Sequence, residues 1–179
     1  RYYAIQHVYK CEDASAKYYA IFDKTLTDYS GWAFPKDNTF TVGMAFPEGA
    51  DGNSLFDELV CKLRDYGLSI NEVIRREGSL LLRPNGYAKV FAKNNSTLFL
   101  AGEAAGYVSP SSAEGFSFAF NSACALYESF KKGGNIAKHY RNKTKKMRIT
   151  LFIKVIKAHL LYNQFIRKVI MTCNIRAIK

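Results

Sequence analysis

Residues 97–129 read TLFLAGEAAGYVSPSSAEGFSFAFNSACALYES. A short apolar run ends at Gly102, small residues and a loop with a proline follow, and an apolar helical pattern begins at Gly115. The order predicts a buried strand, a loop and a helix N-terminus. Helix N-termini carry unpaired N–H groups and partial positive charge, so this stretch suits an anionic ligand held close to the backbone. An ordinary strand–loop–helix connection is the alternative.

A resemblance gives this stretch a more specific meaning. GEAAGYVSPSSAEGFSFAFNSA resembles the second flavin-binding motif of FAD-dependent oxidoreductases of the glutathione-reductase-like superfamily, and more narrowly that of the geranylgeranyl reductase family. The resemblance implies that an acidic residue meets a ribityl hydroxyl of FAD and that the following helix directs its N-terminus at the flavin pyrimidine. The implied cofactor contacts are Gly102, Glu103, Ala104, Gly106, Pro110, Ala113, Gly115 and Phe116.

A second motif lies earlier in the chain. DYSGWAFPK, residues 28–36, resembles the aromatic motif ending in W-x-F-P-K of geranylgeranyl-reductase-like flavoproteins, and Val42-Gly43 follows as that family expects. In the family this motif belongs to the antiparallel sheet of the substrate domain and lines the cavity that faces the flavin. The implied substrate contacts are Tyr29, Trp32, Phe34 and Pro35. The alternative is that these aromatic side chains are ordinary core residues in alternation.

The two motifs together imply an enzyme that transfers hydride through FAD to or from a hydrophobic substrate, isoprenoid in character, with NAD(P)H as a candidate electron donor. We identify no acid–base pair and nominate no catalytic residue. A flavin monooxygenase or halogenase of the same superfamily is the first alternative. A non-catalytic basic module that binds a membrane or a protein partner is the second.

One expected part of an FAD site is missing from the sequence. No G-x-G-x-x-G follows a strand, so the unit that holds the pyrophosphate is expected to precede Arg1 and the chain to be a C-terminal portion. We therefore predict that the chain alone binds FAD weakly or not at all. The four cysteines are widely spaced, which argues against a metal site; Cys61 and Cys124 are predicted to be buried free thiols in a reducing cytoplasm.

The pattern predicts an α+β fold that forms part of an α/β FAD-binding fold. An antiparallel meander of about four strands is expected over residues 2–46, with a helix from Asn53 or Ser54 to Tyr66 that buries one apolar face. A helix over 114–131 is expected to bury a stripe containing Phe116, Phe120, Cys124 and Tyr127. The predicted domains are a substrate-binding sheet domain (1–96), an FAD-contacting strand–loop–helix (97–133) and basic C-terminal helices (134–179).

Charge is distributed unevenly along the chain. The net charge is +11. The segment after Glu128 contains 14 Lys and Arg residues and no Asp or Glu. The C-terminal segment from Lys145 reads as one or two basic amphipathic helices, which pack on the substrate domain or, alternatively, attach to an anionic membrane surface. Nucleic-acid binding is disfavoured because no reading motif accompanies the charge. The location predicted from these features is the cytoplasm, at the membrane periphery in the second case.

Overall fold

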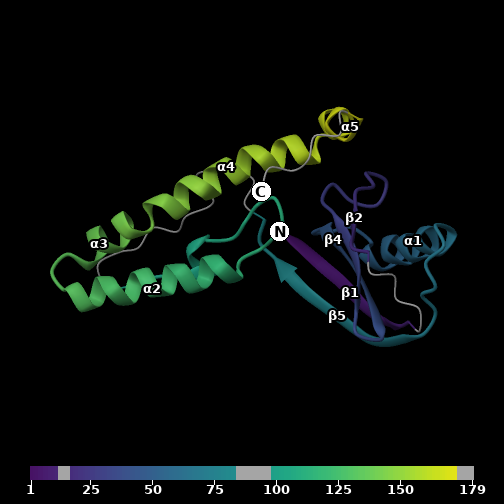
Figure 1. Cartoon of the computed structure of the whole chain (residues 1–179), viewed down its shortest axis with the longest axis horizontal. Coiled ribbons are helices and arrows are strands. Elements are labelled where there is room, and N and C mark those ends of the chain that lie inside the picture. The colour runs from purple at the N-terminus through teal and green to yellow at the C-terminus, as the bar shows by residue number, and fades with distance from the viewer. Residues whose placement is uncertain (12–16, 84–97, 173–179) are drawn as a thin grey trace. The chain divides into compact units, whose positions relative to one another are not determined.

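The protein is described here by a computed structural model that covers residues 1–11, 17–83 and 98–172 (Figure 1). The chain forms two compact units, Arg1–Leu82 and Arg83–Lys179. The first unit is an antiparallel sheet with one helix, and the second is helical. This is the α+β arrangement predicted from the sequence. The predicted domain limits at residues 96 and 133 stay predictions.

Five antiparallel strands form the sheet of the first unit, in the order β2-β3-β4-β1-β5. The strands are β1 (Tyr2–Lys10), β2 (Tyr19–Ile21), β3 (Gly31–Lys36), β4 (Thr39–Pro47) and β5 (Val73–Leu81). Strands β2, β3 and β4 follow one another as predicted. The meander is wrong for β1, which lies between β4 and β5. Hairpin signals report pairing between sequence neighbours, whereas both partners of β1 come from later in the chain.

One helix, α1 (Gly52–Asp65), packs on one face of this sheet (Figure 1). Its first turn is capped by Asp51, whose Oδ1 accepts a hydrogen bond from the Ser54 N–H at 3.3 Å, slightly earlier than the cap predicted. Its buried side chains are those that the periodicity predicts, namely Phe56, Leu59, Val60 and Leu63. They meet the alternate side chains of β4, Phe40, Val42, Met44 and Phe46, in the core of the unit.

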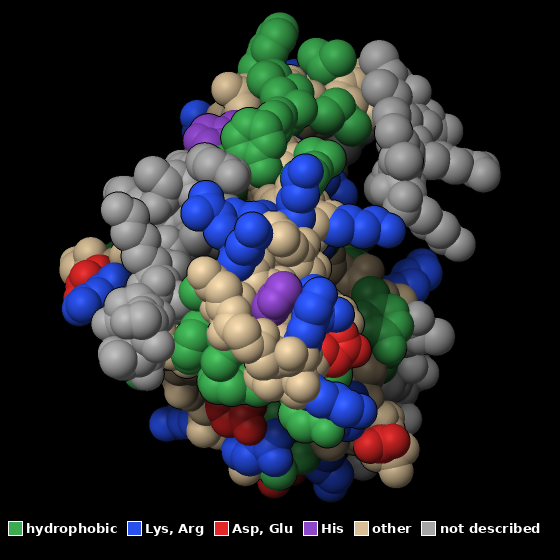
Figure 2. Space-filling model, turned by 90° about the vertical axis from the view of Figure 1, so that its left-hand side faces the viewer, with side chains coloured by type: hydrophobic (Ala, Val, Ile, Leu, Met, Phe, Trp, Pro, Cys, Tyr) green, Lys and Arg blue, Asp and Glu red, His purple; other side chains and the backbone are tan. Residues whose placement is uncertain are grey.

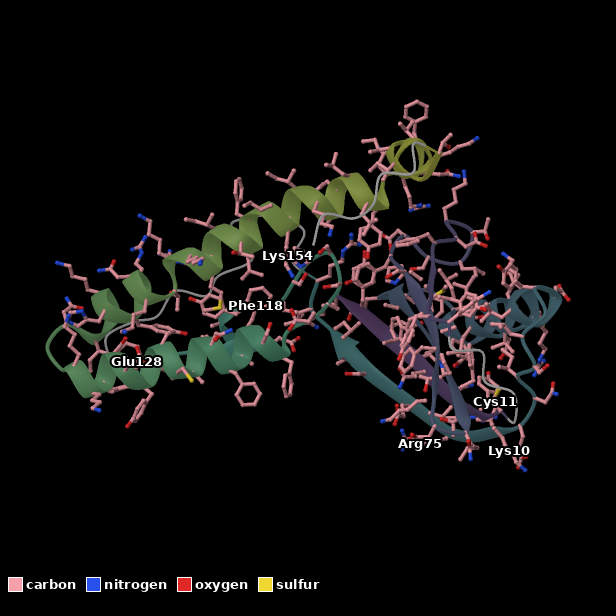
Figure 3. The ribbon with its side chains drawn as sticks, viewed as in Figure 1. Lys10, Cys11, Arg75, Phe118, Glu128 and Lys154 are labelled. Atoms are coloured by element: carbon pink, nitrogen blue, oxygen red, sulfur yellow. The ribbon has the colours of Figure 1, made fainter. Side chains whose placement is uncertain are left out.

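The second unit contains η2 (Gly102–Ala105), α2 (Phe116–Lys132), α3 (Ile136–Lys143), α4 (Lys145–Tyr162) and α5 (Gln164–Thr172). Asn135 caps α3, its Oδ1 accepting a hydrogen bond from the Lys138 N–H at 2.9 Å. Lys and Arg side chains are spread over the surface around α3 (Figure 2). The buried core combines Ala105, Tyr107, Phe118, Tyr140, Leu151 and Val155. Lys154 adds a cation–π contact between α4 and α2, its Nζ lying 5.2 Å from the centroid of the Phe118 ring (Figure 3).

A strand is expected to end at Gly102, but the described residues just before Gly102 form no strand. Ala101 has extended backbone angles (φ −133°, ψ 164°), but 98–101 belong to no strand. An extended segment becomes a strand only where a neighbour completes its hydrogen-bond ladder. In the described residues the sheet consists of β1 to β5 and does not include 98–101.

Two predictions of burial are also wrong. The predicted core stripe of α2 is exposed, with Phe116 at 76%, Phe120 at 60% and Tyr127 at 67% exposure, and Cys124 is exposed beside them. Cys61 is exposed on the outer side of α1. Helix α2 instead packs through a face that contains Phe118, Ser122 and Ser129. Periodicity identifies which faces are apolar, but it does not tell which of two candidate faces the neighbouring helices cover.

Within the described ranges, no helix combines the length and apolar character that crossing a bilayer requires.

Candidate functional site

The predicted cofactor loop begins at η2, where two glycines adopt left-handed backbone angles. Gly102 has a φ of 61° and Gly106 has a φ of 79°. The N–H of Gly106 donates to the C=O of Glu103 at 2.8 Å, and the N–H of Tyr107 donates to the C=O of Gly102 at 3.0 Å. Residues with a Cβ seldom adopt such angles, so both glycines are required by this tight turn itself.

Two side chains from the helices hold the start of the loop in place. The Ser122 Oγ on α2 accepts a hydrogen bond from the Gly102 N–H at 2.8 Å. The Tyr140 hydroxyl on α3 donates to the C=O of Leu100 at 2.9 Å. Burial raises the pKa of Tyr140 well above its usual range, and the neighbouring Tyr107 adds to the rise, so the hydroxyl stays a hydrogen-bond donor at every physiological pH.

The middle of the loop, residues 109–114, closes on itself. The Ser109 N–H donates to the C=O of Glu114 at 2.8 Å, and the Ala113 N–H donates to the C=O of Ser109 at 2.9 Å. Pro110 is fully buried. Ala113 has a φ of 53°, in the region that residues with a Cβ occupy rarely. Closure by these bonds therefore holds one residue in an unfavourable backbone conformation.

A second set of contacts fixes the loop from outside. The Tyr162 hydroxyl, at the end of α4, donates to the C=O of Ser111 at 2.9 Å. The Arg83 guanidinium lies over the Tyr162 ring, 4.2 Å from its centroid, and its Nε donates to the C=O of Pro110 at 3.4 Å. Side chains of its own unit therefore hold the loop at its start and at its middle.

The loop leads into the N-terminus of α2. Glu114 caps the helix, since its Oε1 accepts from the N–H of Ser117 at 2.9 Å and from its hydroxyl at 2.8 Å. Gly115 differs from Gly102 because its φ is −126°, an angle open to any residue. A Cβ added there would make ordinary contacts only, the nearest at 3.6 Å to Val108 Cγ2. Nothing in the packing of the described chain demands a glycine at 115, which leaves close approach of a ligand as a reason for it.

The outward-facing groups of the loop fit a flavin. Glu103, Ala104 and Phe116 are exposed, while Gly115 is half-buried at the helix start. The first turn of α2 supplies backbone N–H groups for the carbonyl oxygens of a pyrimidine ring, and a carboxylate accepts hydrogen bonds from hydroxyls such as those of a ribityl chain. The chemistry of this donor and acceptor set therefore matches the cofactor that the sequence resemblance implies.

The aromatic motif in the first unit lies mainly on the sheet face opposite α1. Trp32 pairs with Gly43 across β3 and β4, and a Cβ added at Gly43 would lie 2.4 Å from the indole ring. The Trp32 Nε1–H donates to Gln6 Oε1 at 2.8 Å, and Gln6 Nε2 donates to Glu77 at 2.6 Å. The indole therefore lies flat on a glycine and is fixed by a polar chain that crosses the sheet.

The other predicted substrate residues divide between the two faces. Phe34 alternates with Trp32 on the same face and stacks on Tyr18, with ring centroids 5.9 Å apart. Tyr29 is buried against Tyr2, at 5.4 Å between centroids, beside the same face. Pro35 pairs with Phe40 and shares the face that α1 covers. Three of the four predicted residues therefore share one face.

The structure brings the cofactor-loop residues together in the second unit and the aromatic residues together in the first. Sequence reasoning missed the side chains that hold the loop, which are Arg83, Ser122, Tyr140 and Tyr162. Ser122 offered a detectable signal, because a serine within an apolar helical pattern often bonds to backbone. Tyr140 and Tyr162 gave no local signal, since their partners lie 40 and 51 residues away in sequence.

No protein-family model matches the chain. Protein CbrA of Escherichia coli O6:H1 is 35% identical over 173 residues, which cover 96% of this chain and 46% of that protein. Protein CbrA of Escherichia coli O157:H7 is likewise 35% identical, over 96% of this chain and 48% of its own length. The chain therefore spans about half the length of the curated relatives it matches.

Two solved structures share the fold. A geranylgeranyl bacteriochlorophyll reductase-like protein from Thermoplasma acidophilum matches 99% of this chain and 48% of its own, with a TM-score of 0.68 and 18% identity. PqsL, a probable FAD-dependent monooxygenase from Pseudomonas aeruginosa, matches 96% of this chain and 51% of its own, with a TM-score of 0.61 and 12% identity. The chain thus has the fold of part of these two structures, as predicted.

Proposed function

We propose that this chain is the flavin-facing and substrate-facing part of an FAD-dependent oxidoreductase that acts on a hydrophobic, isoprenoid-like substrate. The observation that carries the proposal is the loop from Gly102 to Gly115. Side chains hold it at its start and its middle, and it leads to a helix N-terminus beside a glycine that the packing of the described chain does not require. The fold shared with a reductase-like protein and a probable monooxygenase supports it.

Each group of the loop has a defined task in this proposal. The first-turn N–H groups of α2 next to Gly115, other than that of Ser117, which donates to Glu114, bind the pyrimidine edge and stabilise negative charge there. The Glu103 carboxylate accepts a hydrogen bond from a ribityl hydroxyl. Bound FAD would supply the hydride-transfer chemistry. The side chains that hold the loop from behind keep these groups in position, so that little ordering remains when the cofactor binds.

The sheet contributes the substrate surface. The rings of Trp32 and Phe34 lie on the sheet face opposite α1. Tyr29 packs against Tyr2 beside that face. Rings held by packing and by the Trp32–Gln6 hydrogen bond favour an apolar chain and exclude water from it. No proton donor is assigned to the reaction, and NAD(P)H is the electron donor that we propose.

In this proposal the remaining cofactor contacts come from polypeptide outside this chain. It would correspond to the part of the CbrA relatives that this chain does not match. Two observations support this. The chain spans 46% of the E. coli relative, and α2 leaves an apolar row exposed that includes Phe116, Phe120 and Tyr127. An exposed aromatic row of this kind is unusual on a complete domain and suits packing against another part of the fold.

A hybrid protein tests this function. The chain replaces its matching region in E. coli protein CbrA, and the purified hybrid is analysed for bound FAD by absorbance and for NAD(P)H-dependent reduction of geranylgeranyl compounds by mass spectrometry. FAD retention with saturated product supports the proposal. Absence of flavin supports the non-catalytic module instead. If the hybrid does not fold, equilibrium dialysis measures binding of riboflavin and FAD to the chain itself. Weak binding of equal strength supports the proposal, because this chain contacts only the part that the two molecules share. The absence of saturable binding of either molecule contradicts the proposal.

A monooxygenase is the second candidate, and the fold shared with PqsL is the observation that favours it. The two reactions differ in their products. A reductase adds two hydrogens to an alkene without using O₂, whereas a monooxygenase consumes O₂ and adds oxygen to its substrate. Oxygen uptake coupled to a hydroxylated product in the hybrid would assign the chain to the second class.

A further inference from the structure

Helix α4 has two apolar faces, and only one of them is packed. Leu151, Val155 and Ala158 are buried at 0%, 6% and 4% exposure and contribute to the core of the second unit. The opposite side of the helix carries five large apolar side chains that are 43% to 58% exposed: Ile149, Phe152, Ile153, Ile156 and Leu160. These five residues are called the outer row below.

The spacing of the outer row makes it continuous. Its members follow one another at intervals of three, one, three and four residues, which places them on one stripe of an α-helix. The stripe runs for about 16 Å along the axis at 1.5 Å per residue. Phe165 and Val169 on α5 add exposed apolar area at 76% and 45%. Hydrophobic side chains gather over α4 and α5 in the upper part of Figure 2.

Positive charge borders this apolar stripe. At 100° per residue, Lys146 and Lys157 fall on one flank of the outer row and Lys145 falls at its N-terminal end, and all three are exposed. Neither α4 nor α5 contains an Asp or a Glu. The nearest preceding acidic residue, Glu128, forms an ion pair with Lys143. The surface therefore combines apolar side chains with cationic ones on helices that carry no acidic side chain.

We propose that the outer row of α4 and its lysines dock the protein on an anionic lipid surface. An aliphatic row bordered by lysines matches the boundary between acyl chains and anionic headgroups, where the apolar side chains leave water and the ammonium groups meet phosphates. The helix lies along the surface, since it does not meet the requirements for crossing a bilayer. A nucleic acid would satisfy the lysines but leave the outer row in water, so it fits the surface less well. The docking does not depend on the chemistry proposed above.

Vesicle flotation with the full chain tests this proposal. The protein is mixed with phosphatidylcholine vesicles that contain or lack phosphatidylglycerol, at low and high salt. Binding is expected only with phosphatidylglycerol, with a marked loss at high salt. The double variant Ile153→Asn/Ile156→Asn should abolish most of the binding, and Lys146→Gln/Lys157→Gln should weaken it about tenfold or more. Both pairs are exposed, so circular dichroism should show unchanged helix content.

Matched controls remove the same groups elsewhere. Ile74→Asn/Leu80→Asn replaces exposed apolar residues of β5, and Lys24→Gln/Lys36→Gln removes the same charge from the first unit. Both controls should bind like the parent protein. The proposal is overturned by the absence of binding to anionic vesicles, or by equal losses in test and control variants. It is also overturned if light scattering shows a dimer that the Ile153/Ile156 variant dissociates, because the outer row then belongs to an interface between two copies.

Discussion

The hydroxyl of Ser122 on α2 accepts a hydrogen bond from the backbone N–H of Gly102 at 2.8 Å and donates to the C=O of Ala119 at 3.0 Å. Ser122 is fully buried. One small side chain thereby joins the middle of the helix to the start of the candidate cofactor loop, and it satisfies a backbone donor that the turn at η2 cannot satisfy itself.

Ser122→Ala should therefore loosen the loop. The variant leaves the buried Gly102 N–H without its acceptor, at a cost of about 1–3 kcal/mol. Hydrogen exchange of residues 100–107 should become faster by a matching factor. Ser129→Ala is the control, because Ser129 is equally buried but bonds only to the C=O of Ala125 in its own helix, at 2.6 Å. Similar exchange in both variants would show that the Ser122 bond does not hold the loop.

Substitutions at Gly102 and Gly115 distinguish a glycine that the fold requires from one that ligand binding would require. Gly102→Ala places a Cβ 3.2 Å from that of Ala119 at a φ of 61° and should destabilise the second unit. Gly115→Ala meets no such barrier, because its Cβ makes only ordinary contacts, and it should leave thermal stability within about 1 kcal/mol of the parent. If the glycine at 115 admits the cofactor, this variant should weaken FAD binding in the hybrid while its circular dichroism stays unchanged. Full FAD retention by Gly115→Ala would remove that role.

The packing of Trp32 on Gly43 gives a fluorescence test, because Trp32 is the only tryptophan of the chain. Gly43→Ala puts a Cβ 2.4 Å from the indole, so the ring must move and its hydrogen bond to Gln6 must lengthen or break. We expect a red-shifted emission and a loss of about 1–3 kcal/mol in unfolding free energy. Gly78→Ala on β5 is the control, since its Cβ would lie 3.6 Å from the C=O of Ala4. An unshifted spectrum in Gly43→Ala would contradict the observed stacking.

An ion pair links the loop after β2 to α1 and makes the first unit sensitive to acid. Hydrogen bonds from Lys62 and Thr25 lower the pKa of Asp23 to about 2. Because the folded-state pKa lies below the unfolded one, the stabilisation is complete above the unfolded value of about 3.9 and is lost as pH falls toward 2. Asp23→Asn should lower stability at neutral pH and reduce the further loss between pH 4 and 2.

Urea denaturation followed by Trp32 fluorescence measures this difference. Lys62 is also paired with Glu58, so Asp23→Asn leaves the lysine one partner and the effect should be modest. Glu48→Gln serves as the control, because the Glu48 carboxylate makes a long, exposed contact with the Arg1 guanidinium at 3.9 Å. If the unfolding free energy falls equally steeply between pH 4 and 2 in the parent and in Asp23→Asn, this pair makes no contribution.

Local patterns in the sequence were sufficient for several parts of this protein. The spacing of Phe56, Leu59, Val60 and Leu63 determined the buried face of α1, because one packed neighbour covers one stripe of a helix. The small residues and glycines of 102–115 determined a tight loop, since its backbone angles exclude most side chains. The alternation of Trp32 and Phe34 determined that they share a sheet face.

The tertiary structure alone decided which of several possible partners each element takes. It left the Phe116 stripe of α2 exposed and buried Ser122 and Ser129 instead, because α2 packs through the face that also bonds to the loop. It placed β1 between β4 and β5, and it brought Tyr140 and Tyr162 to carbonyl groups distant in sequence. Periodicity reports the polarity of a face, whereas the choice of partner depends on contacts between segments far apart in the chain, which no local pattern contains.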